Sequence, residues 1–141
     1  MAQKKSSNWY IAATHYLTAG FAIPFVVGLV VALLARMGLF TFLSTQLASV
    51  IFSLVISVLS IWLGTMYSAN YLKKAYIIEN KNKIVNLATL YFVVLHFGYF
   101  LFQIFRSNKL TSYSLIGIII TAALFYIFSK KYIKNTEIAV K

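Results

Sequence analysis

Apolar residues fill four long blocks of the chain, and most charged residues lie in the short segments between and around them. The blocks cover residues 9–35, 44–71, 84–105 and 111–128, and each has at least 18 residues. A helix needs about 20 residues to cross ~30 Å of hydrocarbon, where an open chain satisfies its backbone only as a helix. The pattern predicts an all-α integral membrane protein with four transmembrane helices in a single domain, residues 1–141.

The connecting segments predict how these helices are arranged. Short links join the first pair and the second pair, which favours two antiparallel hairpins. Basic residues near helix ends mark the cytoplasmic side. Ten of the 13 basic residues then fall on the side of the termini and three on the other, which predicts a plasma or cytoplasmic membrane protein with both termini inside. The ten are Lys4, Lys5, Lys73, Lys74, Lys81, Lys83, Lys130, Lys131, Lys134 and Lys141, and the three are Arg36, Arg106 and Lys109.

Composition agrees with a membrane protein and changes the meaning of the net charge. The chain is 61% hydrophobic and 11% charged, whereas soluble domains carry about 25% charged residues. The basic residues that give the formal charge of +11 flank the apolar blocks and form no basic stripe. We therefore expect them to contact lipid head groups and not nucleic acid. The first block is too long for the core of a signal peptide, so we expect a retained span.

The second block contains a regular line of small and polar residues. They recur every three or four positions, which places them on one helix face. One interpretation is a seam for close helix packing, and the other is a polar wall along a wet path. We call this line, with its outward extension at Gln46, the serine stripe: Gln46, Ser49, Ser53, Ser57, Ser60, Gly64 and Ser68.

The third block has its own polar line, Thr89, His96 and Gln103, spaced by seven residues. His96 lies about 18 Å from the inner edge at 1.5 Å per residue, close to the depth of Ser57, so the two could meet. An ionisable residue at mid-membrane is a candidate functional group. The alternatives for His96 are contact with water, a hydrogen bond to the serine stripe, or ligation of a haem.

Small residues in the first and fourth blocks suggest further helix contacts. Gly20, Pro24 and Gly28 are four residues apart, and Pro24 is expected to kink its helix. Gly117 belongs to a shorter line of small residues in the fourth block. We expect close helix packing at these glycines.

Missing residues exclude several chemistries. The chain has no Asp and no Cys, and Glu79 and Glu137 both lie outside the apolar blocks. Paired-carboxylate catalysis, a catalytic triad within the membrane and thiolate metal sites are therefore excluded, and we expect no enzyme, metal site or cofactor. A haem between His15 and His96 is disfavoured, because their depths differ by about 9 Å.

These features predict a small non-enzymatic membrane protein. The favoured function is an accessory or assembly subunit that packs against a partner membrane protein or against itself. The alternative is a homo-oligomeric transport or permeation module for a neutral or anionic solute. In length, four spans and inside termini the chain resembles the GtrA-like carriers of lipid-linked sugars, which implies a carrier role of that kind. It lacks the membrane glutamate of the small multidrug exporters, which it resembles in size.

Overall fold

The computed structural model describes residues 4–40, 46–107 and 112–136. In these ranges the chain is helical apart from short connections and one isolated β-bridge between Lys4 and Tyr76. Four of the described helices are long and apolar enough to cross a membrane. The prediction of an all-helical chain with four helices of membrane-spanning length is confirmed.

The helices begin and end close to the predicted limits, with one systematic difference. The second and fourth spans each continue past 71 and 128, to Ala75 and Tyr132. Both extensions contain a pair of lysines, whose long aliphatic stems can follow the apolar surface while the charges reach water. The elements are α1 (Asn8–His15), the π-helix η1 (Tyr16–Ala22), α2 (Ile23–Arg36), α3 (Gln46–Ala75), α4 (Lys81–Ser107) and α5 (Ser112–Tyr132).

Side chains and one glycine define the helix ends. The Ser7 hydroxyl accepts a hydrogen bond from the Tyr10 N–H at the start of α1. The Asn80 side chain does the same for the Lys83 N–H at the start of α4. At the end of α2, Gly38 has φ 76°, a left-handed conformation that glycine adopts without strain.

Pro24 changes the hydrogen-bonding register of the first span. Proline has no N–H and crowds the carbonyl four residues earlier, here that of Gly20. The turns just before it form the π-helix η1, in which the Ile23 N–H donates to the carbonyl of Thr18, five residues back. A π-helical segment thus separates α1 from α2 just before Pro24, the residue at which the sequence predicts a kink.

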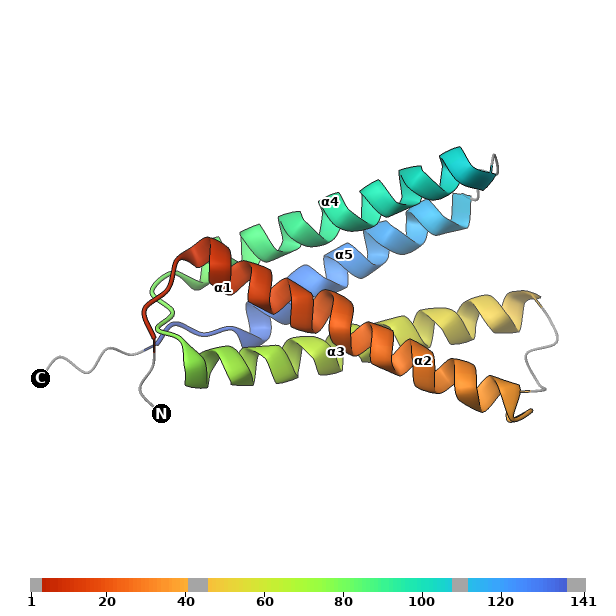
Figure 1. Ribbon diagram of the computed structural model, residues 1–141, viewed down its shortest axis with the longest axis horizontal. Helices are drawn as coiled ribbons and strands as arrows, with labels where there is room; N and C mark the ends of the chain where they lie inside the picture. Colours follow the sequence, from red (N-terminus) through yellow and green to blue (C-terminus); the bar gives the residue numbers. More distant parts are fainter. Residues whose placement is uncertain (1–3, 41–45, 108–111, 137–141) are drawn as a thin grey trace, which may run out of the picture.

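The four spans pack tightly at one end of the bundle and separate toward the other (Figure 1). In the first span every buried residue lies between Ile11 and Gly20, and α2 has none. Beyond η1, α2 packs against α3, whereas α5 packs against both α3 and α4. We call residues 8–20, 60–76, 81–92 and 122–133 the closed half, and residues 23–36, 48–59, 93–106 and 115–121 the open half.

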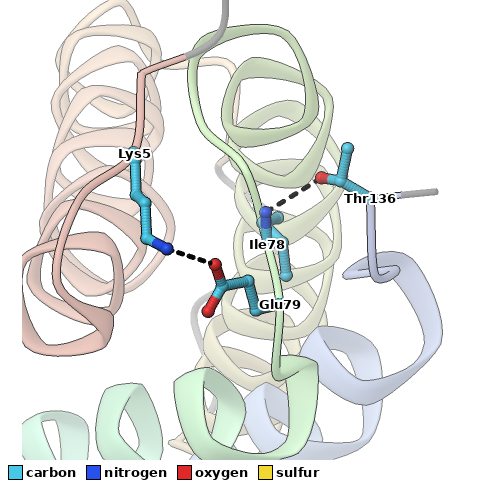
Figure 2. Close-up of polar contacts among 4 residues, drawn as sticks. All are labelled: Lys5, Ile78, Glu79 and Thr136. Atoms are coloured by element: carbon cyan, nitrogen blue, oxygen red, sulfur yellow. Dashed lines mark hydrogen bonds and ion pairs between the residues drawn. The ribbon is translucent and has the colours of Figure 1, made fainter. Parts of the chain in front are cut away.

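Three chain segments are joined at the end of the closed half that is furthest from the open half. The backbone of Lys4 bonds to Ala75 and Ile77 at 2.9 and 3.2 Å. Thr136 forms two hydrogen bonds with Ile78. Its hydroxyl accepts from the Ile78 N–H at 2.9 Å, and its own N–H donates to the Ile78 carbonyl at 2.8 Å. An exposed ion pair, Lys5 with Glu79 at 2.9 Å, lies beside these contacts (Figure 2). We call residues 4–7, 76–81 and 133–136 the clasp.

Candidate functional site

The serine stripe runs through both halves of the bundle and has different neighbours in each. In the closed half, Ser60, Gly64 and Ser68 are buried. A Cβ at Gly64 would lie 2.7 Å from the backbone oxygen of Ala19, so the first span and α3 touch there backbone to backbone. This part of the stripe is a close helix contact, as the packing interpretation requires.

His15 is the centre of the polar contacts in the closed half. Its side chain is 0% exposed, with Nδ1 2.9 Å from the Ser68 hydroxyl and Nε2 2.9 Å from the Ser129 hydroxyl. A neutral imidazole has one donor and one acceptor nitrogen, so one serine accepts and the other donates. His15 therefore links α1, α3 and α5 through a fully hydrogen-bonded ring.

The sequence pattern did not reveal this cluster. His15 was considered only as a haem ligand, and Ser129 belongs to none of the predicted polar lines. The available signal was chemical: a histidine inside an apolar span needs hydrogen-bond partners for both ring nitrogens. Ser68, on the serine stripe, was one obvious candidate partner.

The open half contains a cleft between the separating helices. Its volume is about 550 Å³, and one wall is the outer serine stripe, which is the part of the stripe from Ser49 to Ser60. Ser60, Ile61 and Phe92 are buried residues at its deep end, where the helices come together. Residues from all four spans line the cleft, among them Gly20, Pro24, Gly28, Ser49, Ser53, Ser57, Ser60, His96 and Thr121.

His96 reaches this cleft without bonding to the serine stripe. Its Nδ1 lies 2.9 Å from the Phe92 carbonyl of its own helix, and its ring stacks on the Phe92 ring with centroids 3.9 Å apart. Ser57 lines the same cleft and donates to the Ser53 carbonyl at 2.8 Å. The expected proximity of His96 and Ser57 thus amounts to a shared cleft, and each side chain bonds to its own helix.

The remaining residues of the two polar lines lie elsewhere. The Gln103 amide donates to the Tyr99 hydroxyl on the exposed side of α4. The Thr89 hydroxyl is buried and has no hydrogen-bond partner among the described residues. Gln46 begins α3, and its side chain lies outside the described part of the structure. Of the polar line on α4, His96 alone lines the cleft.

The glycines expected at helix contacts differ in their surroundings. At Gly20 an added Cβ would lie 2.8 Å from the Tyr16 ring and 3.0 Å from the Phe92 ring, so this position requires a small residue. At Gly28 and Gly117 a Cβ would have no described atom within 4 Å apart from its chain neighbours and the backbone of its own helix. The structure therefore gives these two glycines no close helix contact within the described chain, because they lie where the helices have separated.

A second, more apolar groove lies on the other side of His96. Its volume is about 520 Å³, and Tyr16, Leu17, Phe21, Leu95 and Tyr99 line it together with His96. The Tyr16 and His96 rings meet edge to face, with centroids 6.2 Å apart. His96 thus stands between the cleft and a groove that faces outward from the bundle.

The arrangement offers hydrogen bonding in an apolar setting more than it offers acid–base or metal chemistry. No charged residue lines the cleft in the part of the chain that the structure describes. Both nitrogens of His15 are bonded to serines, so the ring presents neither of them to a metal ion. Residues 4–40, 46–107 and 112–136 contain no group of three His, Cys, Asp or Glu side chains that could hold a metal.

Comparison with known proteins gives no relative for this chain: no family model, curated protein or solved structure matches it.

Proposed function

We propose that this protein is a non-enzymatic membrane carrier that holds a lipid-like amphiphile in the cleft of the open half. One observation carries the proposal: the outer serine stripe faces a cleft of about 550 Å³ instead of another helix of the chain. Binding clefts for small molecules are mostly apolar, with a few polar groups that fix orientation. Here Ser53, Ser57 and His96 are such groups.

The length and lining of the cleft suit an extended hydrocarbon chain. From Ser49 to Ser60 the stripe is about 16 Å long at 1.5 Å per residue. Apolar side chains line the cleft beside the serines, among them Val31, Phe52 and Ile56. A mostly apolar cleft with a few polar groups is typical of a site for an apolar ligand, here a lipid tail.

The proposed carrier has two antiparallel hairpins, with both termini in the cytoplasm. Support comes from the excess of basic residues on the side of the termini. The clasp also joins the segment that precedes α1, the α3–α4 connection and the segment that follows α5 at one end of the bundle. The hydrocarbon tail of a bound amphiphile would then lie in the outer part of the membrane.

Retention of a lipid by the purified protein tests the carrier proposal. Wild-type protein in a mild detergent should carry a lipid-like molecule that mass spectrometry detects. Ser57→Phe should remove it, because the larger side chain fills the cleft. Val55→Phe is the matched control, since Val55 is 50% exposed and does not line the cleft. Equal lipid content in the two variants would contradict the proposal.

A second candidate is the accessory or assembly subunit predicted from the packing pattern. It is favoured by three glycines inside membrane-spanning helices, Gly28, Gly98 and Gly117, where an added Cβ would approach no other described helix within 4 Å. Small residues of this kind let transmembrane helices of two proteins approach closely. In that case a foreign subunit should co-purify with wild-type protein and be lost in Gly28→Leu or Gly117→Leu.

The proposed orientation has its own test. The chain has no cysteine, so single cysteines can be introduced without background. An impermeant thiol reagent added outside the cell should label a cysteine at Met37, beyond the end of α2, and leave one at Asn82 unlabelled. The opposite labelling pattern would reverse the proposed orientation.

A further inference from the structure

The hydroxyl groups at the deep end of the cleft have already used their hydrogens. Ser57 donates to the Ser53 carbonyl at 2.8 Å, and Ser60 donates to the Ile56 carbonyl at 2.6 Å. Thr121, on the opposite wall, donates to the Gly117 carbonyl at 2.8 Å. A hydroxyl has one hydrogen and two lone pairs, so each of these oxygens remains an acceptor.

His96 also presents a hydrogen-bond acceptor, because the Phe92 carbonyl to which it is bonded fixes the tautomer of its ring. A carbonyl oxygen only accepts, so Nδ1 carries the proton in the 2.9 Å contact with Phe92. In a neutral imidazole the other nitrogen, Nε2, is then an acceptor. No hydrogen bond to Nε2 is made by any residue that the structure describes.

The deep end therefore presents four acceptors, and the possible donors that line the cleft, the hydroxyls of Ser49 and Ser53, lie further out along α3. Gly20, Ile61 and Phe92 have no polar side-chain atoms, and Pro24 has no N–H. None of the described lining residues is charged. A donor that reaches these atoms in an apolar setting gains a hydrogen bond, so this surface is complementary to a group that brings hydrogens.

We infer that the cleft recognises an uncharged lipid through a hydroxyl group, which donates to the acceptors on α3, α4 and α5. This inference rests on the proposed carrier function and names its ligand class. A phosphate or carboxylate head group would bring only further acceptors and a charge that nothing in the described cleft neutralises. An ammonium group would donate, but its charge would also lack a counter-ion there.

Three probes with the same tail test this inference: 1-hexadecanol, hexadecyl methyl ether and hexadecyl phosphate. Their binding to full-length protein is measured by native mass spectrometry in an amine oxide detergent, which has no hydroxyl to compete. The alcohol should bind about 2- to 12-fold more tightly than the ether, the range expected for one hydrogen bond. The phosphate should bind no better than the ether.

Two threonines provide matched variants for the acceptors. Thr121 lines the cleft, while Thr65 is buried in the closed half, and each hydroxyl donates to carbonyls of its own helix. Thr121→Val removes a cleft acceptor with little change in shape, so it should reduce the preference for the alcohol over the ether. Thr65→Val removes an equivalent hydroxyl outside the cleft and should leave that preference unchanged.

Nitrogen-15 NMR of the two imidazoles gives a readout that does not depend on any variant. Hexadecanol should shift the Nε2 resonance of His96, because a new donor reaches it. The His15 resonances should stay in place, since both of its nitrogens are bonded within the closed half.

The outcomes separate this inference from the carrier proposal. Equal binding of alcohol and ether, preferential binding of the phosphate, or an equal loss of preference in Thr65→Val would overturn the hydroxyl inference and leave a lipid-binding cleft. Failure of all three probes to bind, with no shift at His96, would overturn both.

Discussion

The closed and open halves are formed by the same four spans, yet the serine stripe has opposite surroundings in them. Around Gly64 the stripe meets the backbone of the first span, with space for no side chain. Around Ser57 it borders a cleft. A line of small residues thus predicts that something approaches closely, while the course of the facing helix decides whether that is a helix or a ligand.

The surroundings of the first span change at η1. Up to Gly20 the first span is packed among the other spans, and after Pro24 it packs against α3 and has no buried residue. The π-helical turn between them absorbs the missing N–H of the proline. At the opposite end the clasp fixes the helix ends together, so separation is confined to the open half.

Replacing glycines in the two halves should give the largest contrast. Gly64→Leu forces a side chain into the Ala19 backbone, which cannot move aside as a flexible side chain can. We expect the free energy of unfolding to fall by about 3 kcal/mol or more, or the protein to fail to fold. Gly28→Leu meets open space and should change stability by less than about 1 kcal/mol. Thermal unfolding in one detergent measures both, and equal losses would remove the distinction between the halves.

Replacing the two histidines should give the next largest contrast. His15→Leu leaves Ser68 and Ser129 without their partner, although each hydroxyl can turn to a carbonyl of its own helix. We expect a loss of about 1–3 kcal/mol. His96→Leu removes one bond within its own helix and should cost less. If unfolding showed His96→Leu to be the more damaging change, His15 would not be the main polar link.

Much of the fold follows from the apolar blocks. Residues 84–105 and α4 (Lys81–Ser107) differ by three residues at one end and two at the other, because the bilayer fixes both the length and the polarity of a span. The extensions of α3 and α5 were missed because a pair of lysines was taken to mark the end of a span. The aliphatic part of a lysine side chain can nevertheless lie along the apolar surface of a continuing helix.

The candidate site was predictable only in part. Periodicity placed Ser57 on one face and depth placed His96 opposite it, and both line the cleft. The periodicity of a sequence carries no information about the angle between helices. It therefore did not show that Ser60 is buried while Ser57 is only partly buried, or that Gly28 has no close helix contact. The link between His15 and Ser129 joins residues 114 positions apart, and no local pattern specifies such a contact.

Serine-to-alanine changes should sharpen the comparison at a smaller scale. Ser68→Ala removes a hydrogen bond between helices, and such bonds in membranes average about 0.6 kcal/mol. Ser57→Ala removes a bond to its own helix and should be close to neutral. A double-mutant cycle of Ser68→Ala with His15→Leu should show coupling, and one of Ser57→Ala with His15→Leu should show none. Coupling in the second pair would mean that the halves are not independent.

The smallest effect is expected at the ion pair of the clasp. Lys5 and Glu79 lie 2.9 Å apart, but their side chains are 77% and 54% exposed. Water and salt screen such a pair, so Glu79→Gln should lower stability by less than about 1 kcal/mol, and added salt should abolish the difference. The comparison is Thr136→Val, which leaves the Ile78 N–H without its acceptor and should cost about 1 kcal/mol in salt as well as without it. Unfolding measured at low and high salt distinguishes the two, and a loss in Glu79→Gln that persists at high salt would show that Glu79 stabilises the clasp by more than a screened ion pair.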